Sequence, residues 1–417
     1  MKQNFITLAA ATAIGLVMSA SAYAGDANTL YIDQKGDSNV ADVHQTGSAS
    51  HPSSGGNDIG LDGAPILQDG DRNYFNYTND NHGSGFDNDI VKLKQDGNDN
   101  WFRANDLKNA SGNRVNDVLQ DGDRNQARIW RSNEHGSIVD TLTMRGDRNV
   151  ISITQGLNAV TSGNLVSNVS IIGDDNGYPH ASGFGSGGIL LKQFGTGNTI
   201  TEASIKGSNN RSWTVPTGVR ITQDGSNNGN LFSIARMKGS DGNFIGIDQI
   251  GDENQFNMQQ GVGVNSTGNQ ITLLQTGNEN RATGTQRGDF NQMDVVQAGN
   301  WNGVQVDQQG NTNTASVQIT GDSNGLDLAL PRLTSGLISQ DGNENSVLLT
   351  AIGNSNAFGF KQKGNENSID AIQTGDNNQV GGSQVGNLNQ AVISQGGSSN
   401  IASFVQNGSF NVVGISQ

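Results

Sequence analysis

The residues that most often carry out catalysis or bind metals are few and scattered in this sequence. Its five histidines are isolated, and none lies at the spacing of a metal site or a catalytic triad: His44, His51, His82, His135 and His180. It contains no cysteine, which excludes disulfides, thiolate catalysis and cysteine-ligated metals. No glycine-rich stretch leads into Lys-Ser or Lys-Thr, as a phosphate-binding loop would. The sequence therefore predicts no enzymatic activity and no cofactor.

Acidic residues lie at glycine-containing turns such as Gly70-Asp71-Arg72-Asn73, which are similar to the turns of calcium-binding β-rolls. Those proteins repeat a nine-residue unit, whereas the unit of this chain is longer by two or three positions. Asp also alternates with Asn and Ser at these turns. We therefore expect solvated turns and no metal site.

Amide side chains carry the regular pattern instead. From residue 342 to the end, Gly-x-x-Asn recurs at every eleventh position, and a glutamine lies two positions before each glycine except one, where Ala351 stands. The uninterrupted phase indicates a repeat architecture. The turn glycines are Gly342, Gly353, Gly364, Gly375, Gly386, Gly397 and Gly408; the asparagines are Asn345, Asn356, Asn367, Asn378, Asn389, Asn400 and Asn411; and the glutamines are Gln340, Gln362, Gln373, Gln384, Gln395, Gln406 and, in the same phase, Gln417.

A second block of the same unit precedes this one, with glutamines at Gln275, Gln286, Gln297 and Gln308. The step from Gly321, which ends this block, to Gly342 is one position short of two units, and we expect Pro331 to Gly336 to replace one turn. Nearer the N-terminus the unit recurs at longer spacing, with loops inserted at alternate turns. The chain therefore divides into repeats with inserted loops at 34–276 and regular repeats at 277–417.

Alternation within the repeat predicts short strands. With the glutamine as position 1, the glycine is position 3 and the asparagine position 6, and apolar residues such as Val347 and Leu349 stand at positions 8 and 10. Positions 6, 8, 10 and the next glutamine share one face of a strand, while positions 7, 9 and 11 are mostly polar. Because one coil cannot bury so narrow a face, neighbouring coils must stack on it. We predict an all-β, amyloid-like β-solenoid of stacked strand-turn-strand coils, with 11-residue half-coils and about 22 residues per coil.

An inward-facing amide is costly unless it is paired, since an unpaired buried polar group costs about 1–3 kcal/mol. At the same position in every coil, Gln can pair with Gln and Asn with Asn along the stack, as amides do in cross-β structures. We therefore predict that the in-phase Gln and Asn residues form amide ladders. For Asn, the alternative is a residue that only forms turns.

The first 24 residues have the features of a secretory signal peptide. Lys2 precedes an apolar stretch from Phe5 to Met18, and Ala22-Tyr23-Ala24 suits a cleavage site. We expect a secreted chain that begins at Gly25, with a short segment at 25–33 before the repeats. No later stretch is long and apolar enough to span a membrane, and a net charge of −15 disfavours nucleic-acid binding.

The unit Gln-x-Gly-x-x-Asn followed by a strand that ends in Gln closely resembles curlin, the subunit of bacterial curli fibres, for example at Gln373-Thr-Gly375-Asp-Asn-Asn378. The resemblance runs from about Tyr31 to Gln417, which would make this chain a long, many-repeat member. It implies export through an outer-membrane pore, self-assembly into extracellular amyloid fibres on the bacterial surface with a curli-type nucleator, and a role in adhesion and biofilm matrix. It also implies that the in-phase Gln and Asn residues drive self-assembly. The curli subunits that it resembles have fewer repeats and a leader segment before the first.

A second hypothesis is a monomeric secreted β-solenoid that binds carbohydrate or calcium through a flat face. Such a face requires the same outward residues in every coil, whereas the outward positions of this chain vary. Stacked coils without caps leave an edge on which another chain can pair. We therefore favour self-assembly, with the regular run from Gln340 to Gln417 as the expected stacking end.

Overall fold

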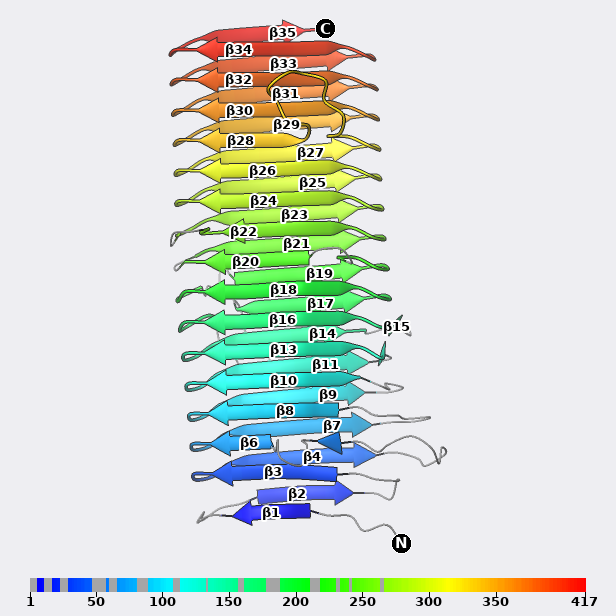
Figure 1. Ribbon diagram of the computed structural model, residues 1–417, viewed down its shortest axis with the longest axis vertical. Helices are drawn as coiled ribbons and strands as arrows, with labels where there is room; N and C mark the ends of the chain where they lie inside the picture. Colours follow the sequence, from blue (N-terminus) through cyan, green and yellow to red (C-terminus); the bar gives the residue numbers. More distant parts are fainter. Residues whose placement is uncertain are drawn as a thin grey trace. The chain divides into compact units, whose positions relative to one another are not determined.

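The computed structural model of the chain describes residues 6–10, 17–22, 29–46, 58–59, 66–80, 89–107, 113–132, 134–156, 161–177, 188–210, 218–229, 233–239, 242–262 and 266–417. The chain forms two compact units, Met1–Ser226 and Asn227–Gln417. All regular structure in the described residues is β-strand, and within each unit the strands stack one above another (Figure 1). The predicted all-β class is thus confirmed.

In the first unit, the chain passes back and forth between two sheets of parallel strands. One sheet contains β1 (Ile6–Ala10), β3 (Thr29–Lys35), β5 (Asp58–Ile59), β6 (Ile66–Asp69), β8 (Asp89–Asp96), β10 (Arg114–Asp121), β13 (Ile138–Arg145), β16 (Leu165–Ile172) and β18 (Thr199–Lys206). The facing sheet contains β2 (Val17–Ala22), β4 (Val40–Thr46), β7 (Tyr74–Asp80), β9 (Trp101–Leu107), β11 (Gln126–Ser132), β14 (Val150–Gln155), β17 (Ile189–Phe194) and β19 (Gly218–Asp224). Two short strands pair separately, β12 (Glu134–His135) and β15 (Thr161–Ser162).

The second unit repeats this arrangement. One sheet contains β20 (Ser233–Lys238), β22 (Gln255–Gln260), β24 (Arg281–Arg287), β26 (Gly303–Gln309), β28 (Leu337–Asp341), β30 (Ala357–Lys363), β32 (Gln379–Val385) and β34 (Ile401–Asn407). The facing sheet contains β21 (Phe244–Ile250), β23 (Gln270–Thr276), β25 (Gln292–Ala298), β27 (Thr314–Thr320), β29 (Ser346–Ile352), β31 (Ser368–Thr374), β33 (Gln390–Gly396) and β35 (Val412–Ser416).

Neighbouring strands within a sheet are parallel and in register, so that equivalent repeat positions lie beside each other. Ser346 pairs with Ser368, and Ser368 with Gln390, each partner lying two repeat units further along the chain. The coil is longer wherever a loop is inserted, as in the 32 residues that separate Gln308 from Gln340. The predicted β-solenoid is confirmed, and the predicted coil of two repeat units describes its uninterrupted turns.

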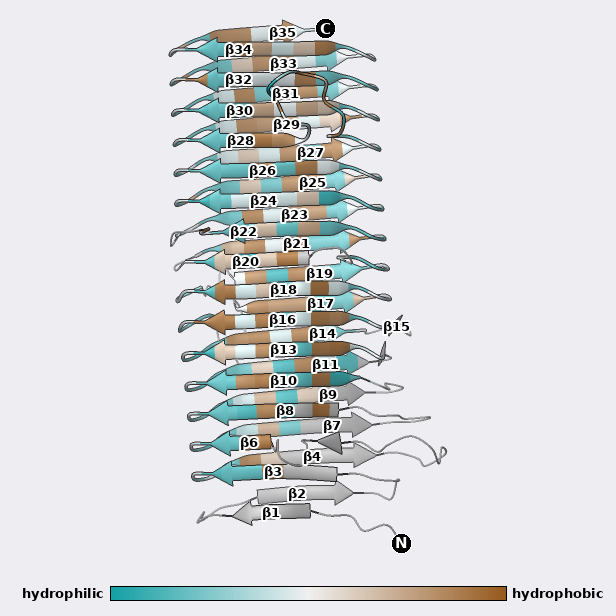
Figure 2. Cartoon of the chain, in the orientation of Figure 1, coloured by the Kyte–Doolittle hydropathy of each residue, from teal (hydrophilic) through white to brown (hydrophobic). Residues whose placement is uncertain are grey.

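The core lies between the two sheets and is lined by repeat positions 6, 8, 10 and 1. In β29, Val347 and Leu349 are buried, whereas Leu348 between them is 45% exposed. The same alternation of buried and exposed residues runs along most strands of the second unit. Hydrophilic residues gather at the turns and apolar residues lie along the strands (Figure 2). The stacked arrangement also brings like side chains together, as with the parallel rings of Phe75 and Phe102, whose centroids are 6.0 Å apart.

The turns are tight because two of their residues adopt left-handed backbone conformations. In the turn after β28, Gly342 has φ +134° and Glu344 has φ +57°. A side chain at such a φ costs roughly 1 kcal/mol relative to glycine. Position 5 nevertheless carries non-glycine residues in nearly every turn, so stacking compensates the strain.

The segment between the two regular blocks differs from the expectation. The predicted replacement of a turn by Pro331 to Gly336 is wrong, because the turn from Gly321 is present and β28 follows it in the usual sheet. Instead, the chain leaves the strand register at Gly325 and returns at Gly336. The backbone N–H groups of these two glycines donate to Asn356 O and Phe358 O, each at 2.8 Å. We call the intervening residues 326–335 the strap.

The N-terminal residues also form strands. β1 and β2 pair in parallel with β3 and β4, and β3 begins at Thr29, within the predicted segment 25–33. The signal peptide and the proposed boundary at residue 277 stay predictions; the compact units divide between Ser226 and Asn227. Among the described residues, no helix is long and apolar enough to cross a membrane.

Adjacent leucines test the assignment of strand faces. Leu349→Ala should lower the free energy of unfolding by about 2–5 kcal/mol, because Leu349 is fully buried. Leu348→Ala should change it by no more than about 0.5 kcal/mol, since Leu348 faces outward. Denaturant unfolding of the two variants measures both values, and equal losses would contradict the face assignment.

Candidate functional site

Buried glutamines form a continuous ladder along one sheet of the second unit. Each glutamine Nε2 donates to Oε1 of the glutamine in the next coil, with N···O distances of 2.8–3.0 Å. These side chains are almost completely buried. Repetition of one residue type therefore satisfies groups that a single coil would leave unpaired. The ladder comprises Gln260, Gln286, Gln308, Gln340, Gln362, Gln384 and Gln406.

The same amide nitrogen also joins the two sheets. Nε2 of Gln362 donates to Ser346 O on the facing strand at 3.0 Å, in addition to its bond to Gln384. Gln384 makes the equivalent bond to Ser368 O at 3.0 Å. Both glutamines thus use both N–H groups, one along the stack and one across the core. The length of the glutamine side chain, with two donors and an acceptor, allows it to serve both directions.

The facing sheet carries a ladder with a gap. Gln275 donates to Gln297, and Gln373 to Gln395, which in turn donates to Gln417. Between these runs, the buried residues Ile319 and Ala351 occupy the glutamine position. Neither can donate a side-chain hydrogen bond, and Oε1 of Gln373 is accordingly buried without a partner.

Asparagines form a second set of ladders at the turns. Oδ1 of Asn345 accepts from both the backbone N–H and Nδ2 of Asn367, at 3.1 and 3.0 Å. Nδ2 of Asn345 donates to Gly364 O of the next coil at 2.7 Å. Asn is therefore a buried ladder residue as well as a turn residue. The chain from Asn345 through Asn367 and Asn389 to Asn411, and the chain from Asn356 through Asn378 to Asn400, follow this pattern.

Stacking also explains the glycine at position 3. A Cβ on Gly342 would overlap the carbonyl oxygen of Gly364 in the next coil. The glycines at 353, 364, 375 and 386 meet the same obstacle. In the last coil, by contrast, a Cβ on Gly397 or Gly408 would find no atom closer than 3.9 and 3.7 Å. At this edge only the backbone conformation, with φ +91° and +101°, favours glycine.

The last coil contains the side-chain donors that, in the inner coils, bond to the following coil. Gln406 accepts from Gln384, but its Nε2 donates only to Gln390 O among the described residues. Nδ2 of Asn411 donates within its own coil, to Asn407 O at 3.2 Å, where inner asparagines reach the next glycine. The predicted ladder residues are therefore brought together within the chain, and their role in assembly stays a prediction.

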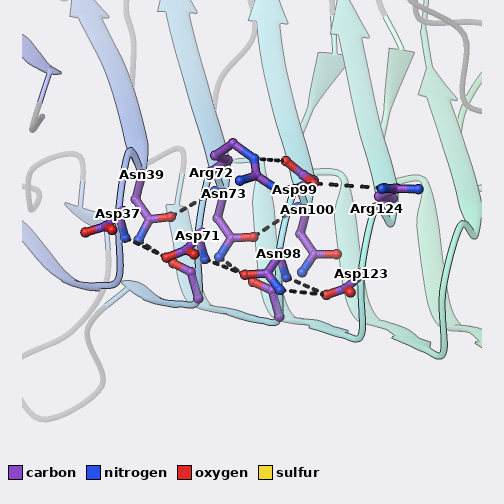
Figure 3. Close-up of polar contacts among 12 residues, drawn as sticks. Asp37, Asn39, Asp71, Arg72, Asn73, Asn98, Asp99, Asn100, Asp123 and Arg124 are labelled. Carbon is purple, nitrogen blue, oxygen red and sulfur yellow. Dashed lines mark hydrogen bonds and ion pairs between the residues drawn. The ribbon is translucent and has the colours of Figure 1, made fainter.

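A third ladder, at position 4, was not predicted from the sequence. In the first unit, the backbone N–H of Asp37 donates to Asp71 Oδ1 at 2.7 Å, Asp71 N–H to Asn98 Oδ1 at 2.8 Å, and Asn98 N–H to Asp123 Oδ1 at 2.7 Å (Figure 3). Asn343 and Asn365 continue the pattern in the second unit. The alternation of Asp, Asn and Ser at this position signals the ladder, because each has an oxygen acceptor on a short side chain.

Charged residues at position 5 of the first unit pair between coils. Arg72 binds Asp99 through two hydrogen bonds, at 2.6 and 2.9 Å, and Arg124 lies 3.9 Å from the same carboxylate (Figure 3). The hydrogen bond from Arg72 lowers the pKa of Asp99. Stability from this pair is therefore present above the ordinary pKa of an aspartate and is lost as the pH falls through the lowered value.

An arginine occupies one rung of a glutamine ladder, which sequence analysis also missed. Arg131 is 2% exposed, and its Nε donates to Gln155 Oε1 at 3.0 Å while an Nη donates to Arg114 O at 3.0 Å. Arg131 thus bonds to the next coil along the stack and to the facing strand across the core, as the ladder glutamines do. A ladder residue lies six positions after each repeat asparagine, and this count from Asn125 leads to Arg131. The spacing alone could therefore have identified it.

Metal-binding residue types do not cluster in the described part of the chain. No group of three or more His, Asp or Glu residues there could hold a metal ion. His44 and His135 lie in β4 and β12, and the other three histidines lie outside the described residues. The repeated chemistry of this structure is hydrogen bonding between coils.

Comparison with protein families connects this geometry to a known repeat. The family model of the curlin associated repeat matches residues 25–51. The match confirms the resemblance drawn from the Gln, Gly and Asn spacing and covers the first coil after residue 24. None of the curated proteins compared with this chain matches it.

The ladder can be tested at a central rung. Gln362→Ala leaves Gln384 Oε1 without its donor and removes an acceptor from Gln340, so unfolding free energy should fall by about 2–4 kcal/mol. The matched control Lys363→Ala, at the next and exposed residue, should change it by less than about 0.5 kcal/mol. Denaturant unfolding decides, and a loss no larger than that of the control would show that the ladder contributes nothing.

The turn glycines give a second test. Gly364→Ala introduces both backbone strain and a clash with the next coil, whereas Gly408→Ala introduces the strain alone. We therefore expect Gly364→Ala to lower the melting temperature of the monomeric chain by several degrees more than Gly408→Ala. Equal losses would mean that backbone conformation, and not stacking, selects glycine.

Proposed function

We propose that this chain is a structural subunit of extracellular curli-like amyloid fibres and that it assembles by adding coil upon coil. One observation carries the proposal: successive coils within the chain are joined by the same set of backbone, Gln and Asn hydrogen bonds. A coil from a second copy can therefore bond to an edge coil as the next coil of the same chain would. Parallel, in-register strands with amide ladders are the arrangement of cross-β fibres.

Two edge coils carry matching residues in register. In the second unit, β34 and β35 each pair with a single neighbouring strand in the described residues, and they present Gln406, Asn411 and Gln417 in phase. In the first unit, β3 and the strand after it carry Gln34, Asn39 and Gln45 at the same repeat positions. Removal of residues 1–24 as a signal peptide would take away β1 and β2 and uncover this edge.

The proposed setting follows from the curlin repeat. A signal peptide places the chain outside the cell, and assembly there would supply adhesion and biofilm matrix. A curli-type nucleator and an outer-membrane export pore are the expected partners. Net charge of −15 disfavours assembly of soluble subunits until an edge templates it. The protein would have no catalytic role.

Filament formation by residues 25–417 tests the proposal directly. After refolding from denaturant at neutral pH, electron microscopy should show unbranched filaments, and fibre diffraction should give reflections near ~4.7 and ~10 Å. A chain that stays monomeric at high concentration in the presence of preformed seeds would overturn self-assembly. It would favour instead the monomeric solenoid that binds carbohydrate or calcium.

A substitution at the edge separates assembly from folding. A Cβ on Gly408 makes no close contact in the single chain. It would clash with Gly36 of an incoming copy whose Gln34 stacks on Gln406, so Gly408→Ala should slow seeded growth at least tenfold. Gly163→Ala, at φ +67° with nothing within 4 Å, is the control for backbone strain and should grow at the original rate. Thioflavin fluorescence measures both rates, and unchanged growth of Gly408→Ala would refute stacking at this edge.

A further inference from the structure

The strap, residues 326–335, breaks the regularity of the second unit (the yellow-orange loop in Figure 1). It leaves its strand at Gly325 and rejoins it at Gly336. The hydroxyl of Ser335 closes the loop, because it donates to Gly325 O and accepts from the N–H of Leu328. Ala329 N–H donates to Gln379 Oε1 on β32 at 3.1 Å. The strap is therefore fastened to strands beyond its own, in the direction of β34.

The strap covers an outward face that is shaped to receive it. Gly359 of β30 and Gly381 of β32 are buried although they point away from the core. A Cβ on Gly359 would lie 2.8 Å from a methyl group of Leu328, and one on Gly381 would lie 2.5 and 2.7 Å from methyl groups of Leu333 and Leu330. Two adjacent glycines thus form a trough for three leucines, and the strap has a fixed position.

Beyond the trough, the strap overhangs a cavity of about 590 Å³. On the sheet side, the cavity reaches β34, where Ser403 continues the column of Gly359 and Gly381 and Val405 is 72% exposed. The lining contains two cationic side chains, Arg332 and Lys361, and no carboxylate.

Arg332 is held in an unfavourable conformation at the tip of the strap. It follows Pro331 with φ +69°, a position at which a turn of this kind prefers glycine. It is exposed, and no ion pair joins it to any residue in the described ranges. A charged residue thus stands at a position that is suited to glycine, and the cavity beside it contains no counter-ion. This combination indicates a partner that supplies the negative charge.

The register of a second copy would supply it. The residue before each ladder glutamine faces outward, and these residues lie beside each other on neighbouring strands, as Ser383 and Val405 do. If Gln34 of an incoming chain stacks on Gln406, its Asp33 therefore lies beside Val405. Asp33 is half-buried in β3, and no ion pair holds its carboxylate within the part of the chain that the structure describes. Lys35 lies one outward position further along, over Asn407.

We propose that the strap is a docking clamp for the next copy of the chain, with Arg332 binding the incoming Asp33 carboxylate. This inference rests on the proposed function, since it requires stacking of β3 on β34. All coils offer similar hydrogen bonds, so these bonds alone do not decide which coil of the incoming copy binds. The attraction between Arg332 and Asp33 would favour the N-terminal coil and increase its rate of association. It would thereby fix the polarity of addition.

Charge reversal tests the clamp on residues 25–417. Arg332→Asp should slow seeded elongation at low salt about threefold to tenfold and flatten its dependence on salt concentration. Asp33→Arg should do the same, and the double variant Arg332→Asp/Asp33→Arg should regain most of the original rate. Arg332→Gly suits the turn and removes only the charge, so it should slow elongation without lowering the melting temperature.

Arg287→Asp is the matched control, since Arg287 is an exposed arginine on β24, away from the edge. Its elongation rate should equal that of the original chain. If the original chain forms filaments and Arg332→Asp grows as fast, or the double variant gains nothing, the clamp is refuted while self-assembly stands. If neither the original chain nor any variant forms filaments, the proposed function fails and the clamp fails with it.

Discussion

The pairing of a buried amide with the same amide one coil away is the interaction on which this structure depends. Gln362 can stay inside the core because Gln340 donates to it, Gln384 accepts from it and Ser346 receives its second N–H. An isolated coil would keep the bond to Ser346 but leave the groups of both ladder bonds unpaired, at about 1–3 kcal/mol each. The fold is therefore stable only as a stack, and the stack has no intrinsic length.

The same constraint sets the composition of the turns. Coils approach so closely that a side chain on Gly342 would overlap Gly364, and Asn345 reaches the carbonyl of that glycine. On the outside of the turn, an Asp or Asn at position 4 accepts the N–H of the coil before it. Low hydrophobic content is thus compatible with a well-packed fold, because hydrogen bonds along the stack and narrow apolar columns both stabilise it.

Irregular features identify particular coils within a nearly uniform repeat. In the described residues, the buried Arg131 and the strap each occur once, and the paired charges Arg72 with Asp99 and Arg148 with Asp175 occur at only a few turns. Charges and unique contacts of this kind oppose slippage of a strand by a whole coil, which identical ladders alone would permit. In the second unit, the strap places such a feature beside the edge where our proposal locates growth.

The sequence by itself determined the two strands per coil, the inward face and the ladder positions. The repeat period puts Asn345, Val347, Leu349 and the next ladder position on one face whatever the rest of the chain does, because strand geometry alternates strictly. That Ile319 and Ala351 become neighbours in one ladder, the trough at Gly359 and Gly381 and the position of Arg332 were decided only by the tertiary structure. They depend on which residues a full coil or more apart become neighbours and on where a loop folds back, and neither is written in a local pattern.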